Sequence, residues 1–481
     1  MMENQLEFKH NTLSRNSLPL LHWLLFFVSM VYIIINYQEL PVIENKFFRF
    51  NGFSVLMWLS ISFLGAIISS YASNYLQGFK YHRSYNRNSI FFTLSVLLLV
   101  VSNSIWLFIG SWITMGYFIS RLIGVNKDWA EAREASNYTL RWFLLGSLLL
   151  SAGITILALT SDAYNLNEII ARLESIPAWA IMISSLLIIT AALIQSAIYP
   201  FHRWLLSAMT APNPASALMH AGFVNGSGIL LTIFAVLVYY SNTYDLLFII
   251  GGLTAVIAQF TKLQQVQVKH KLACSTIAQM GFMIMQCGLG YFNAAIAHLI
   301  LHGFYKAYLF LSAGEEIKNS NPVQALPIRI KPYQALIVLT FSVVGAVMFL
   351  MLTGKEFAWN SSIFLTLIVA ITVGQATYNI IKETTFSFLK RILFSVIIFS
   401  TGIGMYALMF NGVAGMLETM PMVEVPRQLS FLEIFFGILF LLGFFFMKLG
   451  KYRQIPWLYV KLLNISQPAA KTIHQYKSKA S

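Results

Sequence analysis

The sequence predicts an all-α polytopic membrane protein, and three observations support this fold class. The 481 residues are 57% hydrophobic and only 10% charged, with a mean hydropathy of +0.68, whereas soluble domains carry roughly 25% charged residues. Apolar runs long enough to cross a bilayer recur along the chain and predict about 14 membrane-spanning helices. Basic residues alternate in density between successive connections, as they do in multi-pass membrane proteins.

The predicted spans follow one another with short connections. They cover 18–36, 53–75, 88–102, 104–124, 138–160, 177–198, 215–240, 245–262, 270–290, 293–313, 333–353, 362–382, 389–411 and 429–449. The boundary that needs most support separates 88–102 from 104–124, because the only break is a polar tripeptide at 102–104. Merging these two spans would move the basic residues of 121–141 to the external side and destroy the charge alternation.

With a cytoplasmic N-terminus, most of the 32 Lys and Arg residues fall in cytoplasmic segments. The pattern predicts an inner (plasma) membrane protein with both termini in the cytoplasm. The net charge of +14 is therefore explained by the basic residues that set the orientation of the chain in the membrane. Nucleic-acid binding would require a basic soluble domain, and no segment is long enough to form one. The first apolar run lacks a small-residue cleavage site, so we expect a retained helix instead of a signal peptide.

The sequence contains no signature of a bound cofactor. Its two cysteines, Cys274 and Cys287, form no CxxC pair, which argues against a zinc or iron–sulfur site. Phosphate-binding and dinucleotide-binding glycine motifs are also missing from the sequence. We therefore expect no cofactor in this chain, and we do not expect the chain to be an enzyme by itself.

The span at 293–313 carries three titratable residues at four-residue steps: His298, His302 and Lys306. On a helix this spacing places them within roughly an 80° arc along about 12 Å of the axis. Ionisable residues inside a membrane are costly and usually mark an ion or proton path. The alternative is that the histidines are neutral and hydrogen-bond between helices while Lys306 reaches toward an interface.

Two hydrophobic regions contain polar or helix-breaking residues. In the first, Gln195 and prolines at 200, 212 and 214 surround a short piece with His202 and Arg203, before a helix that carries His220. The second is FLMLTGKEFAWNSS, followed by the span that contains Gln375. Such pairs point to inverted repeats with a pathway at the membrane midplane. Packing kinks and ordinary amide hydrogen bonds are the alternatives; an amide can position water but cannot relay charge.

This pattern predicts four parts. They are an N-terminal segment with two spans (1–87), a first half (88–262), a second half (263–411), and a last span with a basic tail (412–481).

Two long motifs resemble a known family. The first is QSAIYPFHRWLLSAMTAPNPASALMHAGFVNGSGILL (195–231). The second is VQVKHKLACSTIAQMGFMIMQCG (266–288) together with the next span, whose residues His298, His302 and Lys306 we call the ladder. Both resemble signatures of the proton-translocating antiporter-like subunits of respiratory complex I and of Mrp antiporters. The resemblance covers roughly residues 85 to 385. It implies a proton pathway, and it places His220, His298, His302 and Lys306 at members of that pathway. The interrupted segments add Gln195 and Gln375 to the predicted pathway, as amides that position water.

The chain departs from the family at two charged positions. Trp112 stands where the family has a membrane glutamate, and Gln195 stands where it has a lysine. The resemblance therefore does not imply the long-range charge relay of complex I. PNPASALMHAGFVNGSG and FISRLIG resemble more closely the DabB-type membrane subunits of bacterial inorganic-carbon accumulation systems. That resemblance implies a large soluble DabA-type partner on the cytoplasmic side that holds zinc and is similar to a β-type carbonic anhydrase.

The expected function is thus a proton- or cation-conducting membrane subunit that couples influx to carbon dioxide hydration in the partner. A proton-pumping subunit of a complex I-type or Mrp-type assembly is the alternative. A stand-alone sodium antiporter should offer a carboxylate inside the membrane, because Na⁺ prefers oxygen ligands. The middle of the predicted spans contains no acidic residue.

Overall fold

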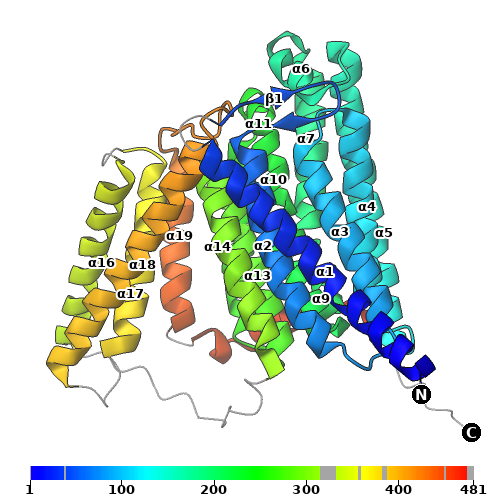
Figure 1. Cartoon of the computed structure of the whole chain (residues 1–481). Helices are drawn as coiled ribbons and strands as arrows, with labels where there is room; N and C mark the ends of the chain where they lie inside the picture. The colour runs from blue at the N-terminus through cyan, green and yellow to red at the C-terminus, as the bar shows by residue number, and fades with distance from the viewer. Residues whose placement is uncertain are drawn as a thin grey trace, which may run out of the picture.

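The computed structural model describes residues 2–36, 40–314, 332–355, 359–381, 387–448 and 451–473. Within them the chain is a bundle of long helices (Figure 1), with one small antiparallel hairpin of β1 (Ile43–Glu44) and β2 (Arg49–Phe50). The hairpin and α6 lie at one end of the bundle, and the N-terminus lies at the opposite end. We call the hairpin end the outer end, because the charge pattern predicts that it faces the outside.

The helices of residues 2–262 lie within the broken region or on either side of it. They are α1 (Met2–Ile35), α2 (Gly52–Tyr75), α3 (His82–Val101), α4 (Ile105–Ile123), α5 (Ala130–Ser161), α6 (Leu166–Ala171), α7 (Ala178–Gln195), α8 (Arg203–Ser207), α9 (Asn213–Leu218), α10 (Gly226–Ile233), α11 (Ala235–Ser241) and α12 (Tyr244–Lys262).

The chain after residue 262 begins with a tight helical hairpin. Its helices are α13 (Val268–Gly288), α14 (Phe292–Leu311), α16 (Pro332–Thr353), α17 (Ser362–Ile381), α18 (Phe388–Met416), α19 (Phe431–Lys448) and the short α20 (Pro456–Ile465). α16, α17 and α18 contact one another, and α18 also packs against α14.

The predicted all-α membrane fold is confirmed. Each of the fourteen expected spans overlaps a helix or, for 215–240, a run of short helices. Among the described residues, eleven helices are long and apolar enough to cross a membrane. α13, α17 and α19 are not among these eleven, so the total of fourteen spans stays a prediction.

The break at 102–104 is confirmed, because α3 ends at Val101 and α4 begins at Ile105. Asn103 fixes this turn at the outer end. Its side-chain amide donates to the carbonyl oxygen of Asn45 at 2.7 Å, and its own carbonyl accepts from the backbone N–H of Leu166 at 2.7 Å. A turn whose polar groups are satisfied in this way can end two membrane helices.

The two interruptions seen in the sequence differ in kind. In the first, α7 ends at Gln195 and the chain forms short helical pieces before α9, so this helix is broken within the bundle. In the second, α16 ends at Thr353 and α17 begins at Ser362. The described polar residues Lys355, Asn360 and Ser361 therefore lie between spans, where backbone groups do not have to be satisfied inside the membrane.

The α12–α13 pair packs closely because glycines face its contact. A Cβ atom added at Gly281 would lie 2.7 Å from the backbone nitrogen of Ala255 and 2.8 Å from the carbonyl oxygen of Gly251. Small residues of this kind let membrane helices approach closely.

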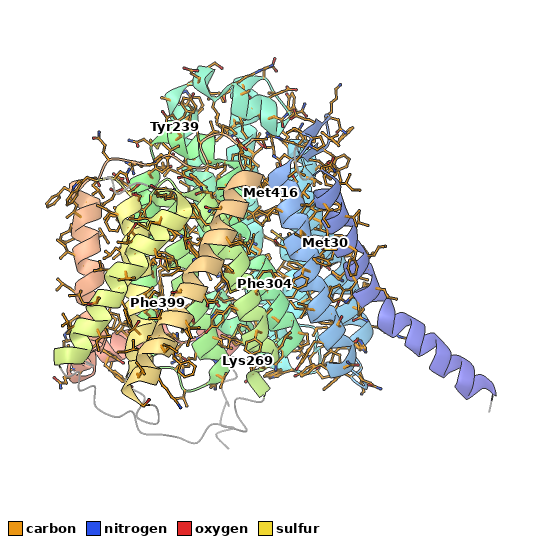
Figure 2. The ribbon with its side chains drawn as sticks, turned by 60° about the vertical axis from the view of Figure 1, so that its left-hand side comes forward. Met30, Tyr239, Lys269, Phe304, Phe399 and Met416 are labelled. Atoms are coloured by element: carbon orange, nitrogen blue, oxygen red, sulfur yellow. The ribbon has the colours of Figure 1, made fainter. Side chains whose placement is uncertain are left out.

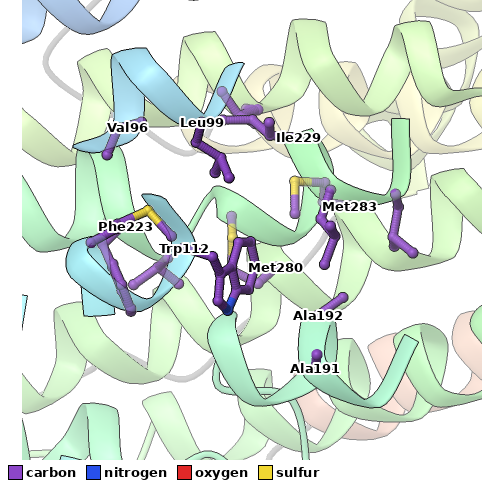
Figure 3. Close-up of a cluster of buried hydrophobic side chains, with 14 of the residues drawn as sticks. Val96, Leu99, Trp112, Ala191, Ala192, Phe223, Ile229, Met280 and Met283 are labelled. Atoms are coloured by element: carbon purple, nitrogen blue, oxygen red, sulfur yellow. The ribbon is translucent and has the colours of Figure 1, made fainter. Parts of the chain in front are cut away.

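Trp112 of α4 is 2% exposed and lies in the apolar core. Figure 3 shows the indole beside Met280 and near Phe223. The position at which the family carries a charged residue is therefore filled here by an uncharged ring within a hydrophobic cluster.

Candidate functional site

The titratable residues of α14 lie along one side of the helix, as their spacing predicts. The two ends of the bundle can be followed in Figure 2, where Tyr239 of α11 marks the outer end and Lys269, at the start of α13, marks the inner end. The rings of His298 and His302 are stacked, with centroids 6.0 Å apart and planes 20° apart. His302 is 6% exposed, and Lys306, one turn further toward the inner end, is fully buried.

His220 approaches this ladder from a different helix. It lies in a π-helical turn, Met219–Phe223, that continues α9. Such a turn inserts an extra residue into a helix and is often found at functional sites. The His220 ring stacks on Phe310 of α14, with centroids 4.2 Å apart, and its Nδ1 atom lies 3.0 Å from Oγ1 of Thr276 on α13.

One backbone carbonyl links His220 to Lys306. The Thr276 hydroxyl donates to the carbonyl oxygen of Leu272 at 3.1 Å, and the Lys306 ammonium donates to the same oxygen at 3.0 Å. A hydroxyl has a single proton, so when Thr276 donates to Leu272 it accepts from Nδ1–H of His220. The network therefore assigns this tautomer to neutral His220 and leaves its Nε2 lone pair free.

Several imidazole nitrogens of the site have no protein partner among the described residues. They are Nε2 of His220, Nε2 of His298, and both ring nitrogens of His302. Buried polar atoms are nearly always hydrogen-bonded to protein or to ordered water. We therefore expect water between these rings, since a water needs two to four polar partners to be held in a cavity.

The structure describes the side chain of only one of the two amides predicted for the pathway. Gln195 donates from Nε2 to the carbonyl oxygen of Phe223 at 3.1 Å, so it supports the π-helical turn that presents His220. It does not contact the α14 ladder through any hydrogen bond in the described part of the chain. Gln375 lies on α17, but its side chain is outside the described residues.

The sequence did not single out Thr276 or the Leu272 carbonyl, although both lie in the second motif. A threonine four residues after the carbonyl it contacts is common in any helix, so spacing alone carries no signal. The buried His22 of α1 was also missed. Its ring bonds Leu18 O at 2.9 Å and Thr93 Oγ1 at 3.1 Å, so it is a fully partnered histidine that joins α1 to α3.

Among the described residues, no group of three or more His, Cys, Asp or Glu side chains gathers as a metal site. The chemistry that the cluster offers is proton transfer: imidazoles with free nitrogens, one buried ammonium and one hydroxyl, at successive depths between α9, α13 and α14.

The family model of the membrane part of NADH:quinone oxidoreductases and Mrp antiporters matches residues 102–354, just over half of the chain. The chain belongs to this family. The matched region runs from α4 to α16 and contains His220 and the α14 ladder.

Curated relatives match a similar region. The chain is 38% identical over 287 residues to a probable inorganic carbon transporter subunit DabB of Bacillus anthracis, covering 56% of this chain and 54% of that protein. It is 34% identical over 242 residues to subunit DabB1 of Halothiobacillus neapolitanus, covering 49% of this chain and 43% of that protein. It is 31% identical over 277 residues to NADH-quinone oxidoreductase subunit L of Pseudomonas aeruginosa, covering 56% of this chain and 44% of that protein.

The chain thus spans about half the length of the curated relatives it matches. Among solved structures, a chain of the Mrp complex from Dietzia sp. superposes with a TM-score of 0.67 at 21% identity. The match covers 96% of this chain and 56% of that one. At this identity the likeness establishes the fold alone.

Proposed function

We propose that this chain is the proton-conducting membrane subunit of an inorganic-carbon uptake complex. Protons that move inward through it drive carbon dioxide hydration in a soluble, zinc-containing partner similar to carbonic anhydrase. Relatives that carry the name inorganic carbon transporter subunit support the substrate class. The DabA-type partner, its zinc and its cytoplasmic position follow from the sequence resemblance.

The observation that carries the proposal is the connected cluster of titratable groups. His298 and His302 stack in sequence along α14, and Lys306 and His220 share a bridge through Thr276 and the Leu272 carbonyl. A neutral imidazole has one nitrogen that donates a proton and one that accepts a proton, so a row of imidazoles and waters can pass a proton along. The cluster supplies such groups where the membrane otherwise excludes them.

The membrane potential is large enough for the coupling. One proton that crosses about 100 mV releases about 2.3 kcal/mol. Because about 1.4 kcal/mol is a factor of ten in an equilibrium constant, this energy shifts a coupled reaction by about fortyfold. Proton influx can therefore favour bicarbonate over carbon dioxide without ATP.

The test uses the membrane complex in a host that lacks carbonic anhydrase and depends on the complex for bicarbonate. We expect His302→Ala and Lys306→Ala each to abolish bicarbonate accumulation. His22→Ala is the matched control, because His22 is an equally buried histidine outside the cluster. An uncoupler should stop uptake, whereas ATP depletion at a held potential should not. Normal uptake by both cluster variants would contradict the proposed route.

A second candidate is a proton-pumping subunit of a complex I-type or Mrp-type assembly. The match to NADH-quinone oxidoreductase subunit L favours it, and Trp112 and Gln195 argue against it because the charged pair expected at these positions is missing. Purification of the native assembly separates the two. Flavin-containing, quinone-reducing subunits would support the respiratory assembly, and a soluble zinc protein would support carbon uptake.

A further inference from the structure

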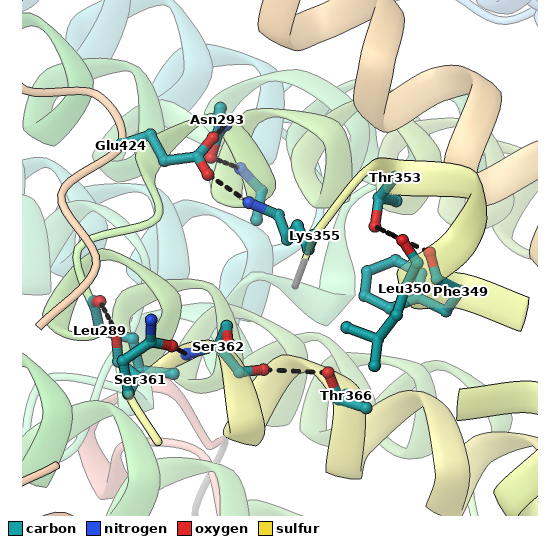
Figure 4. A network of polar contacts seen from close by, with 12 residues as sticks. Leu289, Asn293, Phe349, Leu350, Thr353, Lys355, Ser361, Ser362, Thr366 and Glu424 are labelled. Carbon is teal, nitrogen blue, oxygen red and sulfur yellow. Dashed lines mark hydrogen bonds and ion pairs between the residues drawn. The ribbon is translucent and has the colours of Figure 1, made fainter. Parts of the chain in front are cut away.

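A charged cluster covers the outer end of α14. Figure 4 shows Glu424, from the connection between α18 and α19, with its carboxylate bound by the ammonium of Lys355 and the side-chain amide of Asn293. Asn293 lies in the first turn of α14, the helix that carries the ladder. The Lys355 ammonium also lies 4.8 Å from the ring centre of Tyr291 and 5.0 Å from that of Phe410.

The backbone fixes Glu424 in this place. The backbone N–H groups of Phe292 and Asn293 both donate to the carbonyl oxygen of Val423, and Val425 donates to the carbonyl of Gly290. Gly290 has φ of +84°, and a Cβ atom there would lie 2.1 Å from the carbonyl oxygen of Val425. The carboxylate is therefore held on the α13–α14 turn, with its side chain about one third exposed (33%).

A buried amide lies one layer deeper. Gln286 of α13 is 0% exposed, and the Tyr406 side chain of α18 faces it. The Tyr406 hydroxyl is in polar contact with this amide, but neither the nitrogen nor the oxygen of Gln286 has a hydrogen bond of good geometry among the described residues. Because an amide offers two donor hydrogens and one acceptor oxygen, this buried group keeps the capacity to hold ordered water.

These layers continue into the ladder. Phe282, one helical turn further inward than Gln286 on α13, packs against His298 with ring centres 5.2 Å apart. His298 itself lies five residues, or about 7.5 Å along the axis, inward from Asn293. From the outer end the polar groups thus follow in the order Glu424 on the α13–α14 turn, Gln286 of α13 with Tyr406 of α18, and then His298 and His302 of α14.

We infer that Glu424 and Gln286 form the outer limb of the proton route, with Glu424 as the entry acceptor and Gln286 as the residue that positions water between Glu424 and His298. This inference rests on the proposed function. Glu424 takes a proton from external hydronium and releases water, which weakens its ion pair with Lys355. The proton then passes to water held by Gln286 and from that water to Nε2 of His298 in the tautomer that carries its hydrogen on Nδ1, and the Glu424 carboxylate binds Lys355 again.

The first test measures whether external water reaches Gln286. In the complex, Cys274 and Cys287 are replaced by Ala, and Gln286→Cys is treated from outside with a small charged methanethiosulfonate. Ile284→Cys is the control, because Ile284 is equally buried (0% exposed) on the same helix and lies in the apolar core. We expect Gln286→Cys to react about tenfold faster than Ile284→Cys, a difference of about 1.4 kcal/mol in access. Equal rates would overturn the inference.

The second test measures proton influx in oriented vesicles that contain the complex and an internal pH dye. Glu424→Gln keeps the contact with Asn293 and removes the titratable carboxylate. We expect influx at external pH 8, where protons are scarce, to fall about tenfold, corresponding to about 1.4 kcal/mol, with a smaller loss at external pH 6. Glu418→Gln, an exposed glutamate in the same connection, should conduct like the wild type.

The outcomes separate the two levels of the argument. A wild-type complex without proton influx would refute the proposed function, and the labelling experiment would still report on the outer limb. Normal influx by Glu424→Gln at both pH values in a conducting complex would refute the outer limb and leave the inner cluster intact.

Discussion

Replacing Thr276 by valine isolates the bridge between His220 and Lys306. The side chains have nearly the same shape, so the buried site stays filled while the hydroxyl is lost. Nδ1 of His220 then loses its only protein hydrogen bond among the described residues, and one of the two side-chain donors to the Leu272 carbonyl disappears. The remaining side-chain donor to that carbonyl is Lys306, at 3.0 Å, beside the backbone bond of the α13 helix.

The magnitude follows from one hydrogen bond. A buried hydrogen bond contributes about 0.5 to 1.5 kcal/mol, so the transfer-competent orientation of His220 becomes about 2- to 13-fold rarer. Proton influx driven by a potassium diffusion potential, with the complex in liposomes, should fall by the same factor. A larger loss would mean that the Thr276 hydroxyl itself passes the proton.

Thr232→Val is the matched control for this prediction. Thr232 is also buried, and its hydroxyl donates to the carbonyl of Gly228, four residues earlier, at 2.7 Å without joining a histidine. The two variants should therefore have similar stability but different conductance. The reasoning is refuted if Thr276→Val conducts as well as Thr232→Val.

Two further predictions concern the frame around the site. Gly281→Ala places a methyl group against the α12 backbone and should destabilise the protein by about 1 to 3 kcal/mol in thermal unfolding; Gly404→Ala, which meets no described atom within 4 Å, should not. His202, between α7 and α8 and outside the spans, donates to the Ile465 carbonyl of α20 at 2.8 Å, and burial lowers its pKa to about 4. In the unfolded chain this histidine binds a proton below about pH 6.5, whereas in the folded protein it stays neutral down to about pH 4. The contribution of neutral His202 to the free energy of unfolding is therefore fully present above pH 6.5 and is lost as the pH falls toward 4, by about 2 kcal/mol at pH 5. Thermal unfolding of His202→Gln, which keeps a donor but does not titrate, should show a smaller loss between pH 7 and pH 5; an unchanged loss would show that His202 is not the responsible group.

The membrane fold could be predicted in detail because hydrophobic length and charge alternation are local properties of the chain. The helix boundary at 102–104 is an example: a tripeptide and the neighbouring basic residues decided it, and the structure confirms it. The ladder could also be foreseen, because a four-residue spacing on a helix leaves little freedom in where side chains point. The second interrupted region shows the limit, since a polar segment reads the same whether it lies within a helix or between two helices.

The partners of the ladder could not be foreseen for a different reason. His220 contacts Thr276 across 56 positions of sequence, and Glu424 contacts Asn293 across 131. No spacing rule connects residues on different helices; only the way the helices pack does. Gln195 illustrates the same point, because its contact with the Phe223 carbonyl shows what it supports, and the sequence showed only that it is an amide.

The sequence by itself therefore determined that the chain is a helical membrane protein and that His298, His302 and Lys306 share one side of a helix, because hydrophobicity and helical periodicity act within a few turns of chain. Only the tertiary structure decided which groups contact these residues and which polar groups lie on the outer end of α14. That decision depends on the packing of the π-helical turn against α13 and on the connection after α18 that lies on the α13–α14 turn, because these contacts bring distant polar atoms within hydrogen-bonding distance.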